Sequence, residues 1–144
     1  MRTRLIVIAA AALCLAADAP KDAVKKDQEK LQGDWILASG ERDGEQFPDD
    51  MVKSLKRSVT GDKFTVNRDD QTVTKGTFTL DPSKKPKAID LKIESNDQVI
   101  QRIYELDGDT LKLCHAAPGE ERPKQFGTKA GSGHALVVWK KAKK

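Results

Sequence analysis

The sequence predicts a mainly β protein: an antiparallel up-and-down barrel of about eight strands, with one short inserted helix and an N-terminal helical lead-in. Short runs of alternating apolar and polar residues recur from residue 33 onward, separated by turn residues at roughly 8–12-residue spacing. Sequential hairpins dominate this pattern, and closing them into a barrel leaves no exposed edge strand. The 144 residues suit one such domain.

The first residues have the layout of a secretory signal peptide. A short basic start precedes an apolar run from Leu5 to Leu15, which small alanines follow. The run is shorter than the roughly 20 residues of a transmembrane helix. We therefore expect a signal peptide over residues 1–17, cut between 16 and 19; an uncleaved membrane anchor is the alternative. Once cleaved, the chain is expected to be exported (periplasmic, envelope-associated or secreted) and not an integral membrane protein.

Charge and cysteine content restrict the function classes. The formal net charge of +4 falls to about +2 without the signal peptide, because two of the 26 Lys and Arg residues are lost with it. Lysines alternate with acids along the chain, so no nucleic-acid partner is predicted. Cys114 is the one thiol outside the signal peptide, and the exported chain would therefore have no internal disulfide.

The lead-in and the first strand differ in their residue period. Residues 18–32 are helical in composition but carry a thin apolar stripe, which indicates a helical or flexible lead-in. The period then becomes two, and Trp35 and Leu37 share one face of a strand that ends at the Asp43-Gly44 turn. The barrel domain is assigned to residues 33–141.

One helix interrupts the strands. It is expected from Pro48 to Lys56, because proline and two aspartates occupy its first turn. The clearest half-buried strand runs from Ile89 to Ile93, and Asp107-Gly108 is a strong hairpin signal. The other expected strands lie near residues 58–60, 64–66, 72–80, 99–106, 109–114 and 135–139.

An ordered set of segments resembles a known family. The segments are residues 30–35 (KLQGDW), Asp43-Gly44, residues 84–91, residues 103–114, residues 121–126 and residues 131–134 (GSGH). Over about residues 28–141 the chain is similar to an uncharacterised lipocalin-like family of small exported domains, expanded in planctomycete bacteria. The later signature segments of true lipocalins have no clear match. The resemblance implies a lipocalin-like barrel outside the cytoplasm and carries over no catalytic residues, because that family has no assigned activity.

Known catalytic motifs are absent from the sequence. It lacks Gly-x-Ser-x-Gly, a Walker loop, His-Glu-x-x-His and Cys-x-x-Cys. Cys114, His115 and His134 are the most suggestive metal ligands, but adjacent residues of a strand point to opposite faces. We therefore predict a protein that is not an enzyme and has neither a metal site nor a cofactor.

The hairpin around Asp107-Gly108 supplies the candidate ligand face. With a two-residue turn, Arg102, Tyr104 and His115 share a face with apolar residues, as a pocket for an anionic head group requires. With a bulged turn the register moves by one residue and Arg102 faces solvent. Both registers are open on the sequence alone.

Three further side chains are candidates. Arg122, next to Pro123, either clamps a carboxylate or phosphate or ties a long loop to the barrel. Trp35 and Trp139 lie in the first and last strands, which are neighbours in a closed barrel, and either fill the core or stack on a ligand.

These patterns favour non-catalytic binding of a small apolar or amphiphilic ligand in the barrel. The alternative is an extracytoplasmic protein-interaction or inhibitor module, in which the barrel is filled and a surface patch contacts a protein partner. The speculative ligand-binding residues are Trp35, Arg102, Tyr104, His115, Arg122 and Trp139.

Overall fold

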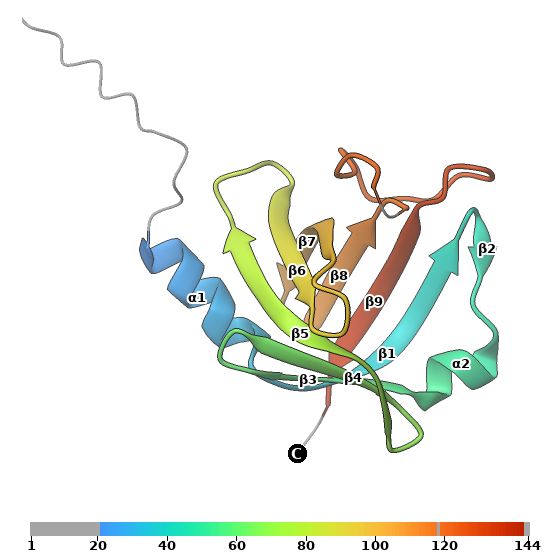
Figure 1. Cartoon of the computed structure of the whole chain (residues 1–144), viewed down its shortest axis with the longest axis horizontal. Coiled ribbons are helices and arrows are strands. Elements are labelled where there is room, and N and C mark those ends of the chain that lie inside the picture. The colour runs from blue at the N-terminus through green and yellow to red at the C-terminus, as the bar shows by residue number, and fades with distance from the viewer. Residues whose placement is uncertain (1–20, 118, 143–144) are drawn as a thin grey trace, which may run out of the picture.

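The computed structural model describes residues 21–117 and 119–142, and the expected signal peptide lies outside them. Two helices and nine strands are found in this part of the chain (Figure 1). They are α1 (Lys21–Leu31), β1 (Gly33–Arg42), β2 (Glu45–Gln46), α2 (Asp49–Ser54), β3 (Leu55–Thr60), β4 (Lys63–Arg68), β5 (Gln71–Asp81), β6 (Lys87–Ile93), β7 (Val99–Asp107), β8 (Thr110–His115) and β9 (Ala135–Lys141). Neither described helix is long and apolar enough to cross a membrane.

Eight of the strands form a closed antiparallel barrel. The order around it is β1-β3-β4-β5-β6-β7-β8-β9, and β9 pairs with β1 to close it. A register shift between Leu37 and Ser39 interrupts the β1–β9 ladder. The predicted up-and-down barrel is confirmed, and closure leaves no unpaired edge among these eight strands.

The inserted helix is shorter than expected. It ends at Ser54 instead of Lys56, and β3 begins at Leu55. Lys56, the last residue of the predicted helix, pairs with both Ile36 of β1 and Asn67 of β4, so sheet pairing on two sides replaces the end of the helix.

The β7–β8 hairpin turns at Gly108-Asp109, not at Asp107-Gly108, because Asp107 pairs with Thr110. Leu106 therefore lies opposite Leu111, which brings two apolar side chains together. The pairing differs by two residues from that of an Asp107-Gly108 turn. Since side chains alternate with a period of two, the same residues still share a face.

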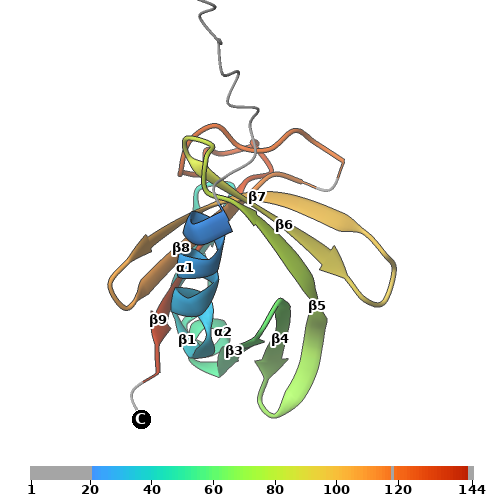
Figure 2. The same cartoon turned by 90° about the vertical axis from the view of Figure 1, so that its left-hand side faces the viewer.

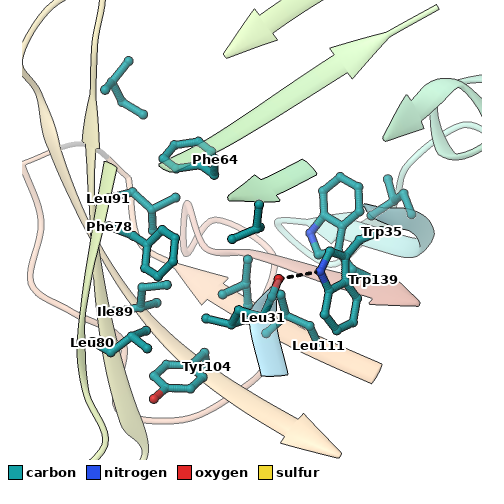
Figure 3. Close-up of a cluster of buried hydrophobic side chains, with 14 residues drawn as sticks. Leu31, Trp35, Phe64, Phe78, Leu80, Ile89, Leu91, Tyr104, Leu111 and Trp139 are labelled. Carbon is teal, nitrogen blue, oxygen red and sulfur yellow. Dashed lines mark hydrogen bonds between the residues drawn. The ribbon is translucent and has the colours of Figure 1, made fainter. Parts of the chain in front are cut away.

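The core consists mainly of aliphatic and aromatic side chains that point into the barrel. Trp35 is fully buried and Trp139 is 4% exposed; Figure 3 shows their indoles on one side of the cluster, with Phe78 and Leu91 on the other. The core consists of Leu31, Trp35, Leu37, Val59, Phe64, Phe78, Leu80, Ile89, Leu91, Ile93, Tyr104, Leu111, Leu113 and Trp139.

Helix α1, the predicted lead-in, packs against the barrel (Figure 2). Its Leu31 is buried in the core, and the Leu31 carbonyl accepts a 2.9 Å hydrogen bond from Trp35 Nε1. The buried Asp27 carboxylate accepts hydrogen bonds from Tyr104 Oη at 2.8 Å and from Lys87 Nζ at 2.9 Å. Apolar packing and one buried polar cluster thus hold the helix to β1, β6 and β7.

Candidate ligand site

The β7–β8 hairpin places a cation and an imidazole inside the barrel. Arg102 pairs directly with His115, two residues along each strand from the core pair Tyr104 and Leu113. Side chains two residues apart on a strand share a face, so Arg102 and His115 point inward with the core. Of the two registers that the sequence left open, the structure shows the one in which Arg102 faces the interior.

A second arginine reaches the interior from the opposite wall. Arg57 of β3 is 2% exposed, and its Cζ lies 4.8 Å from the centre of the Phe64 ring. Sequence reasoning missed this residue because the predicted helix ran to Lys56. The available signal was the alternation of Leu55, Arg57 and Val59, which places the arginine on the face of two apolar residues.

Four buried polar atoms in the described residues have no hydrogen-bond partner. They are Nε of Arg57, Nε of Arg102, Nδ1 of His115 and Nε1 of Trp139. They come from β3, β7, β8 and β9, and all four side chains occupy inward-facing positions. Buried polar groups are nearly always satisfied, so four unpartnered atoms on inward-facing side chains make this part of the barrel interior the candidate ligand site.

The two inward arginines also lack an acidic partner. Across residues 21–117 and 119–142, no carboxylate forms an ion pair with Arg57 or Arg102. Burial, followed by the charge of Arg102, lowers the pKa of Arg57 to about 9. Burial, followed by the charge of Arg42, lowers the pKa of Arg102 to about 10. Both guanidiniums remain protonated at neutral pH, and the compartment is therefore strongly electropositive.

His115 is expected to make the free energy of unfolding of the protein depend on pH. Burial, and then the nearby charges of Arg102, Arg42 and His134, lowers its pKa from 6.5 to about 3. Between these pH values the unfolded chain binds a proton that the folded protein does not, so acid destabilises the fold. His115→Gln is expected to remove this term, worth up to about 1.4 kcal/mol per pH unit.

Urea unfolding of both proteins at pH 7 and pH 4.5 measures the effect of His115. Between these conditions the wild type should lose about 2 kcal/mol more than His115→Gln. Equal losses in the two proteins would show that the imidazole is not held neutral by its surroundings.

Two predicted site residues are already engaged in structural contacts. The Tyr104 hydroxyl donates to Asp27. Burial, and then this hydrogen bond, raises the pKa of Tyr104. The Trp35 indole donates to Leu31, and the Lys141 ammonium lies 5.5 Å from the centre of its ring. Both residues line the core, but their polar atoms serve the packing of α1.

Arg122 lies outside the interior cluster. Its position does not support the prediction that it binds the acidic group of a ligand. Its Nη1 donates to the carbonyls of Arg102 at 2.7 Å and Ile89 at 3.3 Å, and Nη2 contacts the Asp90 carboxylate at 2.6 Å. Asp90 alternates with the core residue Ile89 and therefore faces outward. The β8–β9 loop carries Arg122 over the outer face, where it ties the loop to the barrel.

Cys114 and His115 point to opposite faces of β8. Cys114 is fully buried beneath the β8–β9 loop, with Sγ 3.7 Å from the Gly127 carbonyl and 3.9 Å from that of Gln125. Burial raises the pKa of this thiol. Among the described residues no three His, Cys, Asp or Glu side chains are grouped closely enough to hold a metal ion.

Comparison with known proteins assigns no family to this chain. No protein-family model matches it, and a search of the curated proteins finds no match. The resemblance to the planctomycete lipocalin-like family stays a prediction. The functional argument therefore rests on the geometry of the inward-facing cluster.

Proposed function

We propose that the chain is an exported, non-catalytic binding protein that holds a small amphiphilic ligand inside its barrel. The acidic group of the ligand lies between Arg57 and Arg102. The observation that carries this proposal is the pair of inward guanidiniums with no carboxylate partner in the described chain. Export rests on the residue pattern of positions 1–17 alone.

An anion at this position compensates a large electrostatic cost. An unpaired charge in a protein interior is disfavoured by several kcal/mol, and two like charges add mutual repulsion. An acidic group accepts hydrogen bonds from the unpartnered nitrogens and neutralises the arginines. The neighbouring core residues Leu91, Leu113 and Trp139 offer apolar contacts to the rest of the ligand.

Native mass spectrometry of the protein purified from its own exported fraction tests the proposal. The expected result is a stoichiometric small-molecule adduct that denaturing extraction releases and that carries an acidic group. A clean ligand-free mass, together with a co-purifying protein, would contradict the proposal and favour the protein-interaction module.

Arg102→Met is expected to weaken binding of the extracted ligand by roughly 10- to 100-fold, which corresponds to the loss of one charged hydrogen-bond donor. Isothermal titration calorimetry measures the change. Lys56→Met is the matched control, since Lys56 is an exposed cation of the same barrel and should leave the affinity within about twofold. Equal effects of the two variants would place the ligand elsewhere.

A further inference from the structure

We propose that the interior site selects a doubly charged tetrahedral oxyanion, the head group of a phosphomonoester or of free phosphate, over a carboxylate. This inference rests on the proposed function, because it names the ligand class of the same site. It follows from the charge count, the directions of the donors and the excess of donors over acceptors among the unpartnered atoms.

The charge count favours a dianion. Arg57 and Arg102 each carry one positive charge, and each is without an acidic partner among the described side chains. A carboxylate neutralises one of the two charges and leaves the other uncompensated in the barrel. A phosphomonoester carries close to two negative charges above its second pKa of about 6, and it neutralises both.

The donors approach from different sides of the barrel. In the ring of eight strands, β3 lies opposite β7, so Arg57 and Arg102 extend inward from facing walls. His115 and Trp139 enter from β8 and β9, the two strands that follow β7 in the ring. A carboxylate offers two oxygens in one plane, whereas a phosphoryl group directs three oxygens toward the corners of a tetrahedron. The second arrangement suits donors that converge from four strands.

The cluster is also rich in donors and poor in acceptors. The Nε atoms of both arginines and Nε1 of Trp139 can only donate, and neutral His115 donates from one of its ring nitrogens. Hydroxyl and amide groups bring hydrogens of their own, which would find few acceptors here. A fully deprotonated oxyanion brings acceptors alone.

The test is a comparison of octyl phosphate, octanoate and inorganic phosphate, titrated into the ligand-stripped full chain at pH 8. Octyl phosphate is expected to bind about tenfold or more tightly than octanoate, as measured by calorimetry and by the quenching of tryptophan fluorescence. Arg57→Met and Arg102→Met should each reduce its affinity to about that of octanoate, and the outward-facing variant Lys56→Met should not. Comparable binding of inorganic phosphate supports the oxyanion and identifies free phosphate as its source.

Three outcomes would contradict this inference, and they differ in what they mean for the proposed function. Octanoate binding that equals or exceeds octyl phosphate binding, with loss in both arginine variants, would overturn the dianion and leave the ligand barrel standing. Octyl phosphate binding that both arginine variants retain would overturn the site itself. If neither octyl compound nor inorganic phosphate binds to the folded chain, both the inference and the proposed function fail.

Discussion

Trp35→Ala is expected to lower the free energy of unfolding by about 3–5 kcal/mol. The side chain is fully buried at the start of β1, where its indole lies in the core and donates to the Leu31 carbonyl of α1. Lys141 of β9 covers the ring and reaches the Lys30 carbonyl at 3.4 Å. Truncation therefore removes a large apolar side chain and also weakens the junction of α1, β1 and β9.

Urea denaturation followed by far-ultraviolet circular dichroism measures the effect of Trp35→Ala. Ile36→Ala is the matched control, because Ile36 is the next residue of β1 and is 45% exposed. Its expected cost is below about 1 kcal/mol. A loss below about 1 kcal/mol in Trp35→Ala would show that this residue does not anchor the core.

Arg57→Met is expected to raise the stability of the ligand-free protein by about 1–3 kcal/mol and to weaken anion binding. Methionine keeps much of the apolar stem that packs beside Phe64. It removes a buried positive charge that forms no ion pair with any carboxylate of the described residues. The Arg57 pKa of about 9 lies well below the ordinary value of an arginine, so the folded state disfavours the proton. The gain should therefore be full below pH 9 and disappear as the pH rises toward the ordinary pKa of arginine.

The stability of Arg57→Met is measured by urea unfolding of ligand-free protein at pH 7. Arg57→Ala is the comparison, because it removes the same charge but also the side-chain volume; the resulting cavity should offset the gain. If Arg57→Met unfolds at a higher free energy but binds the anion more weakly, Arg57 contributes to binding at the expense of stability. A clear destabilisation by methionine would show that the guanidinium is compensated, which would remove the main support for the anion site.

Local patterns were sufficient to predict the barrel. The alternation of Ile89, Leu91 and Ile93 correctly identified one face of β6 as core, and Trp35 with Leu37 did the same for β1. Short turns between such strands leave sequential antiparallel pairing as the simplest arrangement. Of the two alternatives for the β7–β8 hairpin, the one with a two-residue turn correctly placed Arg102, Tyr104 and His115 on the inner face. The turn itself lies one residue later than predicted.

The composition of the site depended on contacts between distant segments. No residue spacing relates Arg57 to Arg102, or Asp27 of α1 to Tyr104 of β7; barrel closure and helix packing bring each pair together. Arg122 was an equal candidate by chemistry, yet the path of its loop places it on the outer face.

The sequence by itself determined the alternation within the clearest strands, such as Ile89, Leu91 and Ile93, and that the strands follow one another around a closed sheet. The tertiary structure alone decided which inward side chains meet. It also decided which buried polar atoms find no hydrogen-bond partner among the described residues. The physical reason is that alternation is a property of each strand, whereas the encounter of side chains across the barrel depends on strand number, register and closure together.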